Sequence, residues 1–300
     1  MFRAHMEFRR RPSTLAFMLR AQYPGFLRQA GPFPALRATW VGHRAGGPAL
    51  SDLLRITTPG SSDSLPLLYP HVIGFPLQMV ALTHPAFPIP IWRVLQIRNH
   101  LLQRRPIPVD AVLDFETRVS GQRTVGKGVE VDLRTTVQVD QDLAWESLNT
   151  FFYRGSFGPA DPPSALATAP EVGSEVVARW QTPSAGGWRF GRLSGDLNGI
   201  HWWNAYARFL GYRRAFHHPQ IVLGQCLAHL PATGSGGAQR LDAWLKGPVY
   251  KGAEVRLAAR EEPSGTSFAL FADEERPAIV GRWQSVPEGS RLAPEGGDRT

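Results

Sequence analysis

Cysteine is almost absent from this 300-residue chain, in which Cys226 is the single one. An intramolecular disulfide therefore cannot form, and no cluster of thiolates can hold a metal ion. The chain also opens without the charged and then apolar segments of a secretory signal. We therefore expect a cytoplasmic protein.

Charged side chains are missing from a long internal stretch. Residues 64–92 contain no Asp, Glu, Lys or Arg, which is long enough for a membrane-spanning helix. The stretch also contains six prolines, a density that would break such a helix: Pro66, Pro70, Pro76, Pro85, Pro88 and Pro90. We predict a buried core helix flanked by turns, and no membrane partner.

Nucleic-acid-binding patterns are also missing, although the net charge is +8. The basic residues are mostly single arginines, and no zinc-finger, RNP or basic-helix pattern appears. We expect no nucleic-acid partner, and we interpret the cluster at residues 9–11 as a solvated tail. A diffuse positive charge also suits a phosphate-bearing carrier such as coenzyme A or phosphopantetheine.

A segment rich in Pro, Gly, Ala and Ser divides the chain into two halves of similar size. It lies between Gly155 and Gly173 and has no apolar periodicity, so it is typical of a linker. The predicted organisation has five parts: an N-terminal extension (1–40), a first module (41–155), a linker (156–173), a second module (174–286) and a disordered tail (287–300).

The two halves have similar patterns. Each has an apolar segment of helix length, at 70–82 and at 217–230, followed by alternating apolar and polar residues typical of half-buried strands. His71 and His218 are 147 positions apart (218 − 71), as are Gln78 and Gln225 (225 − 78). We predict an α+β fold in which each half wraps an antiparallel sheet around one central helix.

Residues 192–230 form the segment richest in chemistry. The residues Gly195 to Gly199 are typical of a turn in which Asp or Asn caps a short helix. Asp196 lies in this turn and His201 follows five residues later, so both side chains can point into one space. A carboxylate and an imidazole placed together can share a water or a substrate hydroxyl, as general acid–base catalysis requires.

The same segment resembles the signature of the MaoC-like dehydratase and R-specific enoyl-CoA hydratase family. The matching residues are SGDLNGIH at 194–201, Gly211-Tyr212, and FHHPQ at 216–220. The resemblance implies two tandem hot-dog modules forming a pseudo-dimer, with the second module catalytic. Residues 69–90 look like part of the non-catalytic first module. The implied reaction, a step of fatty acid metabolism, is hydration or dehydration of an acyl thioester of coenzyme A or acyl carrier protein.

The resemblance also implies the roles of individual residues. His201 would handle the proton of the hydroxyl or water, Asp196 the proton at the α-carbon, and Asn198 would orient them. The substrate would contact four further residues, which are Trp202, His218, Pro219 and Gln220. No cofactor and no metal ion are expected.

Two positions depart from the family pattern. Gly199 stands where the family has proline, a change that loosens the turn. Pro219 stands at the family glycine whose backbone N–H polarises the thioester carbonyl, and proline has no N–H to donate. Either the N–H of Gln220 takes over in the first helical turn, or the reaction is altered or lost.

Other interpretations stay open at this point. His217 and His218 could form a metal site with His201, but adjacent side chains usually point apart, which favours capping or pocket lining. A hot-dog fold also hosts thioesterases, and the chain could bind acyl thioesters without turning them over. A homodimer is one assembly that the sequence leaves open.

Overall fold

A single sheet of eleven strands forms the framework of the computed structural model, which describes residues 5–22, 33–57, 63–173, 175–231, 237–272 and 275–292. The strands are β1 (His5–Phe8), β2 (Arg37–Arg44), β3 (Val94–Gln103), β4 (Val112–Val125), β5 (Gly128–Val139), β6 (Asp142–Arg154), β7 (Val176–Gln181), β8 (Gln239–Leu245), β9 (Glu254–Glu262), β10 (Gly265–Ala272) and β11 (Pro277–Ser285). β1 pairs with β2 in parallel, and the other described pairs are antiparallel.

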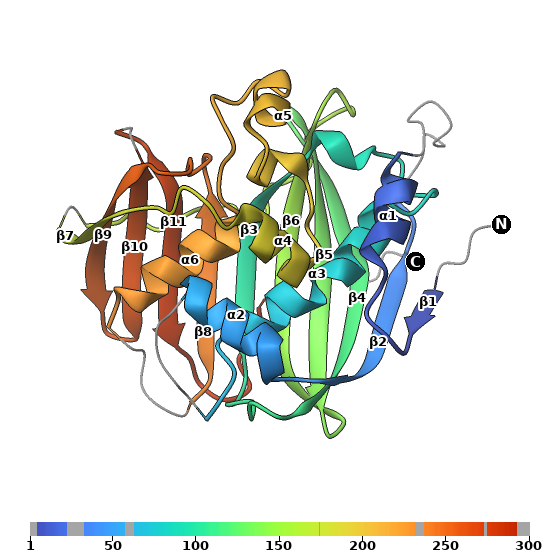
Figure 1. Ribbon diagram of the computed structural model, residues 1–300, viewed down its shortest axis with the longest axis horizontal. Helices are drawn as coiled ribbons and strands as arrows, with labels where there is room; N and C mark the ends of the chain where they lie inside the picture. Colours follow the sequence, from blue (N-terminus) through green and yellow to red (C-terminus); the bar gives the residue numbers. More distant parts are fainter. Residues whose placement is uncertain are drawn as a thin grey trace.

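The helices lie together on one face of this sheet (Figure 1). They are α1 (Thr14–Ala21), α2 (Gly47–Thr57), α3 (Tyr69–Leu82), the short η2 (Ile91–Arg93), α4 (Gly187–Ser194), the short η3 (Gly199–His201), α5 (Asn204–Phe209) and α6 (Pro219–Ala228). Not one of these described helices has the length and apolar character needed to span a membrane.

The sheet consists of two similar halves joined edge to edge. The strand order is β2-β4-β5-β6-β3 in the first half and β7-β9-β10-β11-β8 from the opposite edge in the second. β3 and β8 join the halves as an antiparallel pair, with Asn99 opposite Ala243. The predicted α+β architecture of two modules is therefore confirmed.

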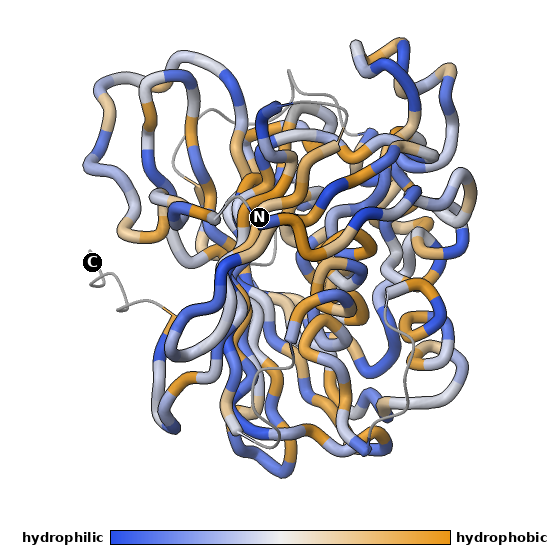
Figure 2. The backbone as a smooth tube through the Cα atoms, turned by 90° about the vertical axis from the view of Figure 1, so that its left-hand side faces the viewer, coloured by the Kyte–Doolittle hydropathy of each residue, from blue (hydrophilic) through white to orange (hydrophobic). Residues whose placement is uncertain are grey.

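The central helices α3 and α6 are buried on nearly every side. Both segments are apolar around their whole circumference, which is what a helix enclosed by a sheet and by other helices requires. Figure 2 shows the hydrophobic residues gathered where the helices meet the sheet. At Gly224 a Cβ atom would lie 2.3 Å from Thr57, so glycine allows α6 to approach α2 closely.

The linker crosses the face of the sheet opposite to the helices. In β8, Leu241 and Ala243 belong to the core under the helices, whereas Trp244 packs on the other face against linker residues. The Trp244 Nε1–H donates to the carbonyl of Leu166 at 3.0 Å. The carboxylate of Asp161 accepts the N–H of Thr124 at 2.7 Å.

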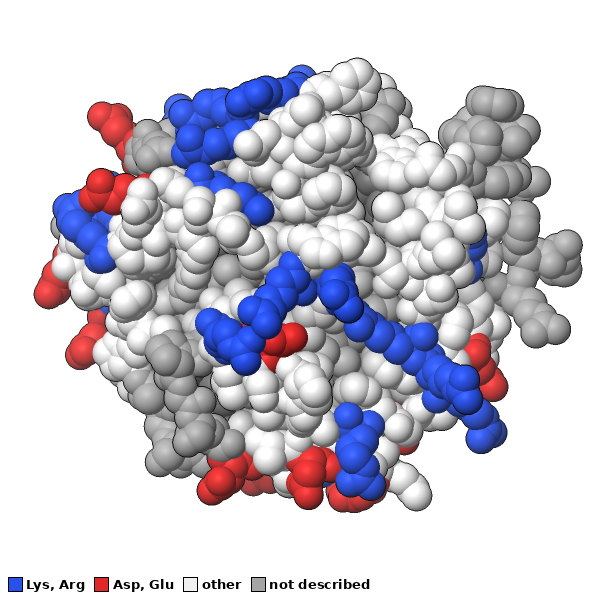
Figure 3. Space-filling view, in the orientation of Figure 1, with Lys and Arg blue, Asp and Glu red and all other residues white. Residues whose placement is uncertain are grey.

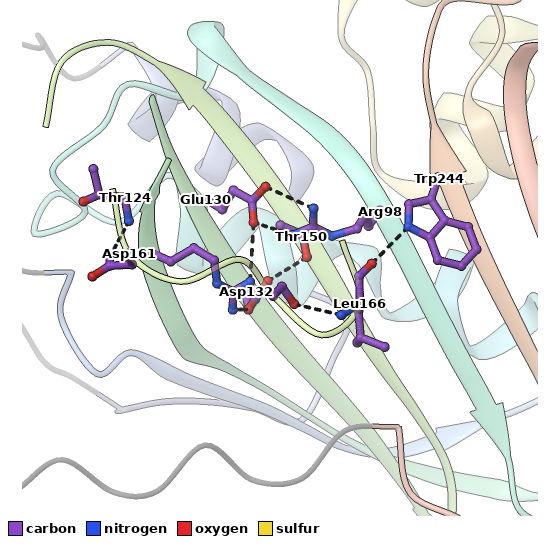
Figure 4. Close-up of polar contacts among 10 residues, drawn as sticks. Arg98, Thr124, Glu130, Asp132, Thr150, Asp161, Leu166 and Trp244 are labelled. Carbon is purple, nitrogen blue, oxygen red and sulfur yellow. Dashed lines mark hydrogen bonds and ion pairs between the residues drawn. The ribbon is translucent and has the colours of Figure 1, made fainter. Parts of the chain in front are cut away.

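Buried polar side chains lie on the same face of the first module (Figure 4). Arg98 forms a two-pronged ion pair with Glu130, and the hydroxyl of Thr150 donates to Asp132 at 2.6 Å. Their burial is compensated by pairing, as charged groups away from water require. The linker packs on this same face through Asp161 and Leu166, so it is an ordered part of the fold.

The two ends of the chain are more structured than the sequence suggests. The predicted boundary at residue 40 lies inside β2, and the expected extension contains β1 and α1. In the predicted tail, Arg240 Nη1 donates to the carbonyl of Arg291 at 3.5 Å, and Leu292 is 3% exposed. Residues 293–300 lie outside the described part of the chain.

Candidate active site

The turn after α4 fixes the position of Asp196. Gly195 ends the helix with a φ of 85°, a left-handed conformation that favours glycine. The Ser194 hydroxyl accepts the N–H of Asp196 at 3.2 Å. The Asp196 Oδ1 atom accepts the N–H of Asn198 at 3.2 Å. The other carboxylate oxygen, Oδ2, is turned toward two histidines.

His201 is the first of these histidines and lies at the end of η3. Its Nδ1 atom is 3.0 Å from the carbonyl oxygen of Phe216, which can only accept, so Nδ1 carries the proton. The Nε2 atom is then unprotonated in the neutral ring and lies 3.6 Å from Asp196 Oδ2. Burial lowers the pKa of His201, although Asp196 opposes this shift. The ring is therefore a neutral base that faces a carboxylate.

His218 is the second histidine and precedes the first turn of α6. Its Nε2–H donates to the backbone carbonyl of Asp196 at 3.1 Å and lies 3.7 Å from the Oδ2 atom. Burial holds the pKa of His218 well below its ordinary value, and the neighbouring His201 lowers it further. The ring stays neutral and holds the loop that carries Asp196.

Glycines in and after α4 let this helix approach the reactive residues. A Cβ atom at Gly187 would lie 2.0 Å from the carbonyl oxygen of His201, and one at Gly191 would lie 2.6 Å from that of Asp196. These glycines, with Gly195, recur every fourth residue and so lie on one helical face. This spacing is visible in the sequence and could have indicated close packing, although it was not among the predicted features.

The departure from the family pattern at Gly199 has a steric reason. A Cβ atom at this position would lie 2.7 Å from the ring of Tyr206. A proline there would require the Tyr206 ring to move. Glycine and the tyrosine therefore fit together as a pair in this chain.

Arg11 joins the N-terminal segment to the same loop. Its guanidinium donates to the carbonyls of Arg192 (3.3 Å) and Leu193 (2.5 Å), in the last turn of α4. Carbonyls at a helix C-terminus lack intrahelical partners and attract cations. The tail interpretation of residues 9–11 is therefore wrong for Arg11, because the segment folds back and Phe17 is fully buried.

A narrow pocket, with free space of about 10 Å³ or roughly one water molecule, lies beside Asp196, between the two modules. The first module contributes one wall through α3, and the second contributes α4, the Asp196 loop and the start of α6. The lining residues are His71, Val72, Phe75, Phe190, Ser194, Asp196, His218 and Gln220. A substrate that widened this pocket would contact both modules.

The remaining predicted site residues lie in different surroundings. Asn198 Oδ1 accepts the N–H of Ile200 at 3.2 Å, so the side chain caps η3. Trp202 is 40% exposed, donates from Nε1 to the carbonyl of Leu197, and is absent from the residues that line the pocket. Pro219 is the first residue of α6, the position that favours proline.

Three ligand-type atoms come together in the site. Side-chain atoms of Asp196, His201 and His218 lie within 4.8 Å of one another, a grouping that could hold a metal ion. His217 is not a member of this group. The two imidazole rings are stacked, and the Nε2–H of His218 is used on a carbonyl. This geometry suits proton transfer better than coordination, which needs both nitrogen lone pairs to converge.

Comparisons with known proteins find similarity to 3-hydroxyacyl-thioester and MaoC-like dehydratases. The 3-hydroxyacyl-thioester dehydratase X of Mycobacterium tuberculosis is 29% identical over 212 residues, covering 69% of this chain and 74% of that protein. The crystal structure of HtdX from Mycobacterium tuberculosis has a TM-score of 0.71 at 22% identity, and covers 83% of this chain and 100% of that one.

A MaoC-like dehydratase from Phytophthora capsici has a TM-score of 0.67 at 18% identity, and covers 84% of this chain and 95% of that one. A scan against family models finds no match. The double hot-dog fold and the resemblance to MaoC-like dehydratases, both predicted from the sequence, are confirmed.

Proposed function

We propose that this chain, a double hot-dog protein similar to the MaoC-like dehydratases, adds water to an enoyl thioester or removes it from a 3-hydroxyacyl thioester. One observation carries the proposal. Asp196 Oδ2 and the unprotonated Nε2 of His201 lie 3.6 Å apart, beside a pocket between the modules. A carboxylate and a neutral imidazole are groups that can carry out general acid–base catalysis near neutral pH.

The two residues act as one proton-transferring unit. In hydration, the water oxygen bonds to the β-carbon and loses a proton to His201 Nε2. The electrons of the double bond move toward the thioester carbonyl, the proton passes from His201 Nε2 to Asp196 Oδ2, and Asp196 then delivers it to the α-carbon. The pair gains one proton and gives one back, so its net protonation is unchanged after turnover. Dehydration follows the same steps in reverse.

His201 is suited to its part by its environment. The carbonyl of Phe216 fixes the tautomer, so Nε2 faces the reacting water with its lone pair. When Nε2 takes a proton, the Asp196 carboxylate stabilises the resulting imidazolium, because opposite charges at this distance attract strongly in a buried site. Asn198, which caps η3, positions His201 through the backbone.

The first turn of α6 can supply a donor to the thioester carbonyl. Pro219 has no N–H, but the N–H of Gln220 lies in the same turn, where no intrahelical acceptor exists. Negative charge that develops on the thioester oxygen is stabilised at a helix N-terminus. We therefore favour an active site with the donor moved by one residue over a site that has lost its activity.

The carrier of the acyl group would meet a positive surface. Figure 3 shows Lys and Arg side chains spread over the face that carries the helices, and acidic side chains mainly at its lower and left margins. The phosphates of coenzyme A or of a phosphopantetheine arm are attracted to such a surface. This supports either carrier and does not choose between them.

Turnover of enoyl thioesters tests the proposal. Crotonyl-CoA and longer enoyl-CoAs, with the matching carrier-protein thioesters, are incubated with the protein while the enoyl absorbance is followed. We expect loss of the enoyl signal, and a fall of about 10² to 10⁴ in rate for Asp196→Asn. Equal rates for the variant and the natural protein would refute the proposal.

The same assay separates the two alternatives. Release of free thiol without change in the enoyl signal would identify a thioesterase. Ligand binding without any product would identify an acyl-thioester-binding protein, for which the loss of the N–H at Pro219 is the supporting observation.

A further inference from the structure

A chain of side-chain hydrogen bonds runs from the sheet of the first module to the pocket. It begins at Ser147, whose hydroxyl accepts from Asn149 Nδ2 at 3.1 Å, and Asn149 Oδ1 accepts from Gln96 Nε2 at 3.1 Å. Gln96 Oε1 then accepts from Gln220 Nε2 at 3.2 Å. The same Gln220 Nε2 lies 2.9 Å from His71 Nε2. The chain therefore ends on a histidine of α3.

The direction of these bonds determines the tautomer of His71. An amide nitrogen donates and does not accept, so Gln220 Nε2 donates to His71 Nε2. A neutral imidazole that accepts at Nε2 carries its proton at Nδ1. Complete burial lowers the pKa of His71 to about 3, so the ring is neutral at physiological pH. The hydrogen-bond chain thus leaves an N–H at Nδ1.

This N–H has no hydrogen-bond partner among the described residues. His71 is 1% exposed, so water does not reach most of its surface. Buried donors in native proteins are nearly always paired, because an unpaired one loses its hydration without compensation. His71 also lines the pocket that contains Asp196 and Gln220. Because the Nδ1 atom is itself enclosed, a ligand that widens this pocket would bring an acceptor to it and complete the pairing.

Comparison of the two similar halves shows that His71 forms different hydrogen bonds from its counterpart in the second half. It corresponds to His218, since the two lie 147 positions apart (218 − 71) at the beginning of the two central helices. His218 uses its Nε2–H to hold the Asp196 loop. His71 instead has its Nε2 occupied by Gln220 of the second module. The two equivalent histidines therefore serve one pocket in different ways.

We propose that the Nδ1–H of His71 donates a hydrogen bond to the carbonyl oxygen of the bound acyl thioester. With the N–H of Gln220, it replaces the donor that Pro219 cannot provide. The inference rests on the proposed function. It assigns a carbonyl-polarising residue to the first module, which the family resemblance treats as non-catalytic.

Two matched substitutions test the role of Nδ1. The amide nitrogen of His71→Asn can occupy the position of Nδ1, whereas that of His71→Gln reaches only the position of Nε2. We expect His71→Gln to lower kcat/KM by about 10² and His71→Asn to keep most of it, the loss being that of one carbonyl donor. Equal losses in both variants would overturn the proposal. Gln96→Met, which breaks the hydrogen-bond chain away from the pocket, is expected to give an intermediate loss.

A binding experiment without turnover keeps this test separate from that of the proposed function. Butyryl-CoA is saturated and cannot be hydrated, and S-butyl-CoA lacks the carbonyl. We expect the natural protein to bind butyryl-CoA about ten-fold more tightly than S-butyl-CoA, and His71→Gln to lose this preference.

The carbonyl stretching frequency of isotope-labelled butyryl-CoA gives a direct signature. Hydrogen bonding polarises the carbonyl, so the band should move to lower frequency in the natural protein and less in His71→Gln. Unchanged preference and frequency in a folded His71→Gln variant would refute the role of His71, whatever the result with enoyl-CoAs. If His71→Gln does not fold, the frequency in Gln220→Met decides, because this substitution removes the amide donor that fixes the Nδ1–H tautomer of His71, and a band unchanged from that of the natural protein would equally refute the role.

Discussion

The imidazole rings of His201 and His218 are stacked, with centroids 3.7 Å apart and planes inclined by 25°. Two positive charges at this distance in a buried site would repel strongly. One ring at most can therefore be protonated at a time. Because His218 is held neutral by burial and donates to Asp196, the proposed reaction assigns the exchanged proton to the pair of Asp196 and His201.

Substitutions at the two stacked histidines should have different effects. His201→Gln removes the base, and we expect kcat to fall by about 10² to 10⁴. His218→Gln keeps an amide donor for the Asp196 carbonyl, so we expect a loss of no more than about 10-fold. Measurement of kcat for both variants checks this order, and a reversed order would show that His218 is the base.

The acid limb of the pH–rate profile should lie at a pH below the ordinary pKa of histidine. Burial lowers the pKa of His201, so the neutral base persists below the ordinary histidine value of 6.5. We expect kcat/KM to decline only at a pH below that value, where the imidazole becomes protonated.

Lys251 provides a control for this assignment. Its charge lowers the pKa of His201, so Lys251→Met should move the acid limb to higher pH, whereas Lys251→Arg should leave it nearly unchanged. If the acid limb stays at the same pH in Lys251→Met, a group other than His201 controls it.

The close packing of α4 predicts sensitivity at Gly191. A methyl group there would lie 2.6 Å from the carbonyl oxygen of Asp196, so the loop must move in Gly191→Ala. We expect activity to fall by about 10-fold or more, because small displacements of catalytic groups are costly. Gly247→Ala, which has open space around it, is the matched control. Equal activity of the two variants would contradict the packing argument.

Arg11 should affect activity more than stability. Arg11→Ala removes two hydrogen bonds to the end of α4, and we expect kcat to fall by about 10-fold. The guanidinium is partly exposed, so the melting temperature should change little. Arg11→Lys should restore part of the activity, and Arg10→Ala should have no effect. A loss of stability that matches the loss of activity would show that Arg11 serves folding alone.

Acid should destabilise the protein through its buried histidines. The pKa of His71 is about 3 in the folded state, against an ordinary value of 6.5. Between these values the unfolded chain binds one more proton, so stability is full above pH 6.5 and declines as pH falls. The contribution is about 1.4 kcal/mol per pH unit for one such histidine. Denaturant unfolding at several pH values should show a shallower decline in His71→Gln than in the natural protein.

Long periodic segments were predictable from the sequence. The helix expected at 70–82 is α3, at Tyr69–Leu82, and the half-buried strands expected after it include β4 and β5. Each of these elements is buried in the same way along its whole length, so its apolar residues recur regularly and indicate a helix or a strand. The helix expected at 217–230 is shorter in the structure, because Pro219 begins it.

The strands that join the modules were not predictable. β3 contains Gln96, Asn99, His100 and Gln103, which interrupt any apolar alternation, and three of these are buried. The partner of His100 comes from the other half, since its Nδ1 lies 2.7 Å from Asp242 Oδ1. A pattern within one strand cannot reveal a partner 142 residues away.

The residues of the candidate site were partly predictable. The turn at Gly195–Gly199 indicated that Asp196 and His201 would lie close together, which the structure reproduces at 3.6 Å. The contact of His218 with Asp196 and the contribution of Arg11 were missed, since both depend on segments brought together by folding. Spacing along the chain describes a turn well and distant contacts poorly.

The pairing of β3 with β8 also bears on how this protein can change over generations. In a dimer of identical modules, each substitution appears twice and must suit both copies of the site. Here a substitution in α3 alters one wall of one pocket and leaves α6 as it was. Under the proposed function, the first half is thus free to specialise in recognising the acyl group, while the second half keeps the proton chemistry.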